Sequence, residues 1–144
     1  MRETICVKTA SREVTFYARP TIIEEQQIKG EAGNFTSHGY VKLAEIEAMT
    51  NRYMEECIQK DEKGKSIEGE KPGTVKLDKE HSSFHKYLSF KNIVDSAMFY
   101  GKMKVLTKDT EDFNPDLLSK EEFYEIYSAF EVALSNFRER PIAA

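Results

Sequence analysis

The segment from Ser119 to Pro141 constrains the fold of this chain more than any other part of the sequence. Ser119 followed by Glu122 is a capping box, in which each side chain satisfies a backbone N–H of the first helical turn. Apolar residues then recur at steps of three and four, which predicts a helix with one buried face. These residues are Phe123, Ile126, Tyr127, Phe130, Leu134 and Phe137. Arg138 and Arg140 complement the helix dipole at the far end, and Pro141 ends the helix.

Two further segments have helical periodicity. Residues 40–60 carry apolar side chains at steps of three and four and acidic side chains on the other faces. Residues 78–100 are apolar around more than one face, so this segment is expected to be the central element. Asp78 is its predicted N-cap and Gly101 its predicted C-cap.

Shorter segments favour strands and connections. Residues 4–8 and 13–18 are rich in β-branched and aromatic side chains and are expected to form a hairpin. Residues 74–77 and 103–107 are candidates for two more short strands. Residues 24–39 contain three glycines and are interpreted as a loop. Asn114-Pro115 is expected to start a single helical turn, since proline suits the first helical position.

The predicted fold class is α+β, with about three amphipathic helices packed on a small antiparallel sheet. Residues 60–74 contain one aliphatic side chain, Ile67, and are predicted to form an exposed, flexible loop. The segments on either side of this loop are too small to fold alone. Residues 1–144 are therefore interpreted as a single domain.

Charge and hydropathy exclude some partners. The formal net charge is −4 and basic residues are not clustered, so nucleic acid is an unlikely main partner. No stretch approaches the roughly 20 apolar residues of a membrane span. The first residues do not resemble a secretory signal, and a cytoplasmic protein with buried free thiols at Cys6 and Cys57 is expected.

The sequence offers weak signals for chemistry. His81 and His85 would share a face on a helix and could chelate a divalent metal beside Asp78 or Glu80. Two histidines satisfy only half of a tetrahedral site, so a polar first turn of the helix is the preferred interpretation. Cys57 belongs to an apolar stripe, which favours a core thiol over a nucleophile. No catalytic residue, metal ligand or cofactor is therefore predicted.

Two sets of residues are candidates for binding. Arg12, Arg19, Arg138 and Arg140 are candidate ligands for an anion or a phosphate. Arg12 and Arg19 flank the second strand, where they would equally well protect a sheet edge from unwanted pairing. The second set is aromatic and is expected to exceed what a small core encloses, unless the sheet covers it. Its members are Phe99, Tyr100, Phe113, Tyr124 and Tyr127.

These features support three functional hypotheses. The preferred one is a small, non-enzymatic intracellular accessory or inhibitor-like protein, which docks its aromatic surface on a protein partner or on a copy of itself. The alternative is a binder of a small anionic ligand such as a nucleotide. The second alternative is a metal-dependent hydrolase built around His81 and His85.

Overall fold

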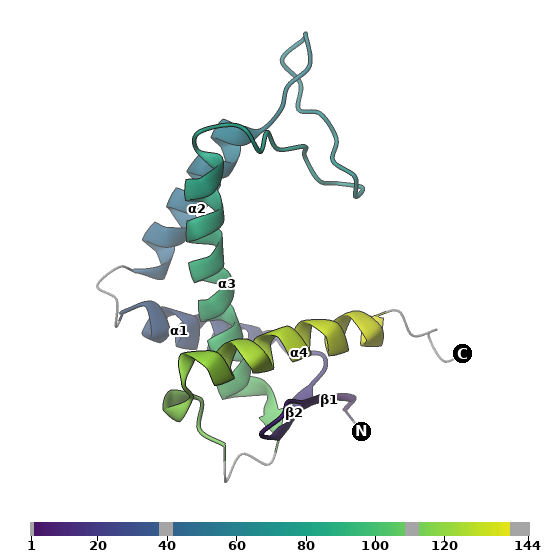
Figure 1. Cartoon of the computed structure of the whole chain (residues 1–144), viewed down its shortest axis with the longest axis vertical. Coiled ribbons are helices and arrows are strands. Elements are labelled where there is room, and N and C mark those ends of the chain that lie inside the picture. The colour runs from purple at the N-terminus through teal and green to yellow at the C-terminus, as the bar shows by residue number, and fades with distance from the viewer. Residues whose placement is uncertain (1, 38–41, 109–112, 139–144) are drawn as a thin grey trace. The chain divides into compact units, whose positions relative to one another are not determined.

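A computed structural model describes residues 2–37, 42–108 and 113–138 of the chain (Figure 1). The chain divides into two units, one formed by residues 1–35 and 98–144 and the other by residues 36–97. The part of the chain that is described contains four α-helices and a three-stranded antiparallel sheet. The α+β class expected from the sequence is confirmed, whereas the single domain over residues 1–144 stays a prediction.

The sheet belongs to the first unit. Its strands are β1 (Thr4–Lys8), β2 (Glu13–Tyr17) and β3 (Thr107–Lys108), in the order β1-β2-β3. The predicted hairpin is present, with Ile5 opposite Phe16 and Val7 opposite Val14. These four side chains are buried, while their neighbours along the strands are more exposed. One face of the sheet therefore forms the floor of a core.

Three helical segments of the first unit supply the rest of this core. They come from α1 (Ile22–Ser37), the end of α3 (Phe84–Leu106) and α4 (Lys120–Arg138). The Phe130 ring lies 4.7 Å from the Phe16 ring and 5.3 Å from the Phe99 ring, measured between centroids. Met103 and Ile126 are buried beside them. Aromatic contacts of this kind stabilise a core beyond the burial of their area.

The beginning of α4 follows the sequence prediction. The Glu122 N–H donates to the Ser119 hydroxyl at 3.1 Å, and the Ser119 N–H donates to the Glu122 carboxylate at 3.3 Å. The predicted helical turn is also present as η1 (Pro115–Leu117), where the Asn114 side chain accepts from the Asp116 N–H at 3.0 Å. The capping box of α4 and the helical turn at Pro115 are both confirmed in their expected positions.

The prediction of a loop over residues 24–39 is wrong, because α1 occupies residues 22–37. Thr21 and Glu24 form a second capping box: the Thr21 N–H donates to the Glu24 carboxylate, and the Glu24 N–H donates to the Thr21 hydroxyl. Ile28 and Ala32, four residues apart, are 3% and 0% exposed. The cap and this short apolar stripe outweigh the glycines, which cost about 1 kcal/mol each in a helix.

The predicted limits of the central helix are also wrong at both ends. Asp78 does not cap α3; its carboxylate accepts from the Glu80 N–H in a turn that precedes the helix. Gly101 does not end α3, which continues to Leu106, so the strand predicted over 103–107 is reduced to its last residue in β3. A Cβ atom at Gly101 would lie 2.4 Å from the Ile28 carbonyl oxygen. The glycine is therefore required by close approach of two helices.

The second unit contains α2 (Leu43–Cys57), the beginning of α3 and the connection between them (Figure 1). The helix predicted over 40–60 is confirmed over residues 43–57, whereas Ile58 and Lys60 form isolated bridges instead. The Tyr53 and Phe90 rings stack with centroids 5.7 Å apart. The Ser83 hydroxyl donates to the Glu56 carboxylate at 2.5 Å. These contacts hold the two helices of this unit against each other.

The connection between α2 and α3 has its own backbone hydrogen bonds. The Gln59 N–H donates to the Lys76 carbonyl, the Lys76 N–H to the Ile67 carbonyl, and the Ile67 N–H to the Gln59 carbonyl. Gln59, Ile67 and Lys76, which lie on three successive passes of the chain, are thus joined by a closed ring of backbone hydrogen bonds. Residues 60–74 are exposed except at Gly69. The strand predicted over 74–77 is wrong, because this segment forms isolated bridges only.

The two thiols differ in exposure. Cys57 is 1% exposed, as predicted, and burial raises the pKa of its thiol, with Glu56 and Asp78 adding to the effect. Cys6 is exposed, which corrects the expectation that it is buried. Its thiol donates to the Glu13 carboxylate at 2.9 Å, and this hydrogen bond raises its pKa. No helix within the described ranges has the length and apolarity needed to cross a membrane.

Candidate functional site

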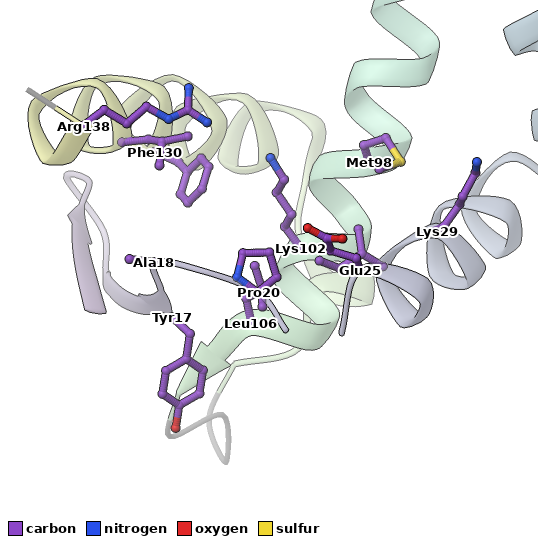
Figure 2. Close-up of a pocket in the computed structure, with 12 residues that line it drawn as sticks. Tyr17, Ala18, Pro20, Glu25, Lys29, Met98, Lys102, Leu106, Phe130 and Arg138 are labelled. Carbon is purple, nitrogen blue, oxygen red and sulfur yellow. The ribbon is translucent and has the colours of Figure 1, made fainter. Parts of the chain in front are cut away.

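A cavity of about 500 Å³ lies in the first unit, between α1, α3, α4 and the end of β2 (Figure 2). Its apolar lining is mostly aliphatic. The residues are Ala18, Pro20, Ile28, Met98, Leu106 and Leu134. The volume lies within the usual range of small-molecule sites, which are concave, largely apolar and carry few polar groups.

Helical periodicity places the lining side chains. Met98, Lys102 and Leu106 follow one another at steps of four along α3. Phe130, Leu134 and Arg138 do the same along α4, and α1 contributes Glu25, Ile28 and Lys29. Residues spaced in this way share one face of a helix. Each helix therefore presents one row of side chains to the cavity, with apolar and charged groups in the same row.

Three cations line this cavity together with one carboxylate. Lys29 and Arg138 are exposed, Lys102 is half-buried, and Glu25 supplies the carboxylate. Figure 2 shows the Lys102 side chain between Phe130 and Glu25. The Lys102 ammonium is 5.5 Å from the centroid of the Phe130 ring. The net charge of the side chains that line the cavity is positive. Charge interactions beside apolar walls are stronger than in bulk water.

The three cations have no carboxylate partner in the described part of the chain. The ion pairs found there join other residues, among them Arg2 with Glu24 and Lys104 with Asp116. Three cations and one carboxylate beside an apolar cavity leave a net positive charge, which favours the binding of an anion.

The wall of the cavity formed by α1 is tied to the strands. The Arg2 guanidinium donates to the Glu24 carboxylate at 2.5 Å and to the Arg19 carbonyl at 3.0 Å. The hydrogen bond from Arg2, together with one from the Thr21 N–H, lowers the pKa of Glu24 to about 2. This pair holds the first turn of α1 near the segment that leaves β2.

The arginines predicted to bind an anion have different surroundings. Arg138 lines the cavity. Arg12 instead pairs with Glu122 at 2.6 Å and lies 5.7 Å from the Phe113 ring, so it joins the hairpin to α4. Arg19 lies 5.4 Å from the Phe137 ring and does not line the cavity. Arg140 falls outside the described residues.

The aromatic residues predicted to bind a partner are mostly enclosed. Phe99 is 2% exposed and belongs to the core, so its ring is not available to a partner in this fold. Tyr100, Phe113 and Tyr127 are half-buried. Burial and a hydrogen bond to Asp116 raise the pKa of Tyr100. Tyr124, at 48% exposure, is the aromatic side chain that the described part of the chain exposes most.

A second hollow, about 700 Å³ and more open, lies on another side of α4 beside the hairpin. Tyr124 lines it together with two carboxylates, Glu121 and Glu125, and with Lys8 from the end of β1. This hollow therefore differs from the cavity in the sign of the charges that the helices contribute.

His81 and His85 do not lie on one face of a helix. His81 precedes α3, and its Nδ1 accepts from the Ser83 N–H at 3.0 Å, whereas His85 lies in the first turn of the helix. The described residues contain no group of three or more metal-ligating side chains. The prediction that His81 and His85 share a helix face, on which the hypothesis of a metal-dependent hydrolase was based, is therefore wrong.

Sequence reasoning missed most residues of the cavity. Lys102 was not singled out, and Glu25 and Lys29 were assigned to a loop. One signal was present for Lys102, since a lysine at the middle of the row Met98, Lys102, Leu106 interrupts an apolar stripe. Lys29 required recognition of the capping box that begins α1.

No protein-family model, no curated protein and no solved structure matches this chain.

Proposed function

We propose that this protein binds a small organic anion, with the apolar body of the ligand in the cavity of the first unit and its acidic group at Lys102 and Arg138. The observation that carries the proposal is a mostly aliphatic cavity lined by three cations that have no carboxylate partner among the described residues. An acidic group would gain charge-assisted hydrogen bonds there, while the rest of the ligand leaves water. The function is binding of the ligand without its chemical conversion.

The lining favours a compact aliphatic or aryl body over a nucleotide base. Phe130 is 3% exposed, and the ring of Tyr17 is engaged by the Arg2 guanidinium at 4.1 Å. Figure 2 shows the hydroxyl of Tyr17 pointing away from the other labelled side chains. Neither ring offers the open face that stacks on a base.

Calorimetric titration of the full chain with octanoate, octyl phosphate and adenosine monophosphate tests this proposal. Octanoate or octyl phosphate is expected to bind more tightly than the nucleotide. Lys102→Met keeps the apolar stem of the side chain but removes its charge, and should weaken binding about tenfold, since hydrogen bonds to charged groups contribute about 1.5–3 kcal/mol. Lys120→Gln, at the other end of α4, is the matched control and should leave the affinity unchanged.

The proposal fails if none of the three probes binds, or if Lys102→Met and Lys120→Gln have the same effect. A preference for adenosine monophosphate would retain the anion site but reject the aliphatic ligand class.

Docking of a protein partner is the second candidate function. Tyr124 favours it, because this ring is 48% exposed and lines the open hollow beside the hairpin. Exposed tyrosines are enriched where proteins meet. The aromatic surface expected from the sequence is reduced to this residue and its neighbours, since Phe99 is buried.

A further inference from the structure

One edge of the sheet carries backbone groups that pair with no other strand in the described part of the chain. The Ala18 N–H donates to the Glu3 carbonyl, and the Thr9 N–H donates to the Arg12 carbonyl. Together with the strand register, these bonds direct the backbone groups of Ile5 and Val7 toward β2. The N–H and C=O groups of Thr4, Cys6 and Lys8 therefore point to the opposite side of β1. Because β1 is the first strand in the order β1-β2-β3, that side is an open edge of the sheet.

A row of α4 side chains lies beside the end of this edge, at Lys8 and the hairpin turn. Glu121, Tyr124, Glu125 and Ser128 line the open hollow, at steps of three and four along the helix. Lys8, Thr9 and Ala10 line its other side. An edge strand beside a helix is the arrangement that accepts an extended peptide as an added strand, in which backbone hydrogen bonds give affinity and alternate side chains give specificity.

The charges of the hollow indicate which peptide fits. Glu121 and Glu125 flank Tyr124 on the exposed face of α4, and neither has an ion-pair partner in the described part of the chain. Lys8 is on the strand, where its side chain lies on the outer face of the sheet with those of Thr4 and Cys6. The helical side of the hollow is therefore acidic, and a basic side chain facing it would be favoured.

We propose that β1 binds an extended segment of a partner protein as an additional strand, with a lysine or arginine of that segment between Glu121 and Glu125 and its neighbouring side chains against Tyr124. This proposal depends on the second candidate function, that a protein partner docks at Tyr124. It adds the mode of binding, the residues of contact and the charge of the partner. Such a strand would use the donors and acceptors of Thr4, Cys6 and Lys8 at the edge.

A second copy of the chain fits this edge less well. Two β1 strands paired about a two-fold axis would place α4 beside the α4 of the other copy. The carboxylates of Glu121 and Glu125 would then face the same residues of that copy, and like charges in contact oppose association. A basic peptide meets no such repulsion.

Peptide selection followed by hydrogen exchange tests the proposal. A phage-displayed library of random nine-residue peptides is panned on the full chain, and the most enriched peptide is synthesised. Enriched peptides should carry Lys or Arg at alternate positions among β-branched residues. Amide exchange is then measured by NMR with and without the peptide. The amides of Thr4, Cys6 and Lys8 should exchange fast in the free protein and slow at least tenfold on binding, whereas those of Ile5 and Val7 change little.

Charge and side-chain variants separate strand addition from the underlying function. Glu125→Lys should weaken the peptide about tenfold, and Glu45→Lys, an exposed site in α2, is the control for net charge. Tyr124→Ala should also weaken it. Cys6→Pro removes one edge donor at a position where its N–H faces solvent, which a strand edge tolerates. If this variant does not fold, the exchange pattern of the unmodified protein still decides the question.

Each remaining outcome has a definite meaning. Binding that responds to Tyr124→Ala without protecting Thr4, Cys6 or Lys8 overturns strand addition but retains docking at Tyr124. No enriched peptide, or binding indifferent to Tyr124→Ala and Glu125→Lys, overturns both. A stable dimer by light scattering, with the same three amides protected in the absence of peptide, assigns the edge to a second copy and also overturns the proposal.

Discussion

Two hollows border α4 in the first unit, and they differ in both shape and charge. The cavity toward α1 and α3 has aliphatic walls and three cations, among them Lys102 and Arg138. The hollow toward β1 is more open, and α4 lines it with Glu121, Tyr124 and Glu125. The same helix thus borders both the cavity proposed to bind a small anion and the hollow proposed to bind a basic peptide.

One amphipathic helix borders both hollows through two different rows of side chains. Phe130, Leu134 and Arg138 form one row of α4, and Glu121, Tyr124 and Ser128 form another. Residues three or four apart share one face of a helix, so the members of each row lie together. The two rows lie on different faces, since they line different hollows. The buried face of α4, which includes Ile126, fixes both rows at once. Changes in the core should therefore affect both hollows, whereas surface changes should affect one.

The largest expected effect comes from a substitution that breaks the cavity wall. Gly101→Ala places a Cβ atom 2.4 Å from the Ile28 carbonyl, so α1 must move. Unfolding in urea should show a loss of about 2 kcal/mol, typical of overpacking, and weaker octanoate binding. Gly30→Ala in α1 is the matched control, since its Cβ would meet nothing within 4 Å. It should stabilise the protein by up to about 1 kcal/mol. Equal effects of the two substitutions would contradict the close approach of α1 and α3.

Charge reversal distinguishes the two hollows. Lys102→Glu should weaken octanoate binding at least tenfold, about 1.4 kcal/mol, because it places a carboxylate against the carboxylate of the ligand. Glu125→Lys should leave octanoate affinity within about twofold and weaken the selected basic peptide instead. Titration of both probes against both variants measures the pattern. Losses shared equally between the probes would show that the hollows are not separate sites.

Acid should loosen the cavity wall through Glu24. Its pKa is lowered to about 2 in the folded protein, from an ordinary value of 4.5, so its stabilising contribution is complete above pH 4.5 and is lost as the pH falls toward 2. The expected size is about 1 kcal/mol, because Arg2 is 40% exposed and water screens the pair. Urea unfolding at pH 5 and pH 2.5 should show this loss in the natural chain and a smaller one in Glu24→Gln. If Glu24→Gln loses as much free energy of unfolding between pH 5 and pH 2.5 as the natural chain, Glu24 is not the cause of the acid dependence.

The smallest expected effect is a difference in salt dependence. The hollow beside β1 is open and its carboxylates are exposed, so raising the ionic strength from 0.02 to 0.5 M should weaken the basic peptide several-fold. Octanoate should be less affected, since part of its affinity comes from apolar burial beside half-buried Lys102. Titrations at the two ionic strengths compare the slopes. A steeper slope for octanoate would reverse the assignment of the enclosed and open sites.

Elements with strong local signals were predictable from the sequence. The capping box at Ser119 and the stripe that includes Ile126 and Phe130 define α4, and alternation defines β1 and β2. The errors arose where local and long-range effects oppose each other. Glycines in α1 indicated a loop, yet the capping box at Thr21 and the burial of Ile28 stabilise a helix there.

The candidate site was less predictable than the fold, because its residues come from three helices and the end of a strand. Of the four arginines proposed to bind an anion, the structure places Arg138 at the cavity and uses Arg12 for an ion pair with Glu122. Lys29 and Lys102 meet there only because α1 and α3 approach closely at Gly101. A contact between distant segments of this kind leaves no periodic pattern in the sequence.

Intermolecular nuclear Overhauser effects between octanoate and the full chain, labelled at its methyl groups, would show whether the ligand binds in the cavity between α1, α3 and α4. We expect contacts from the ligand methylenes to the methyl groups of Ile28, Leu106 and Leu134, and none to Ala10, which lines the hollow beside β1. Contacts confined to methyl groups elsewhere in the chain, or none in the presence of saturating octanoate, would contradict binding in this cavity.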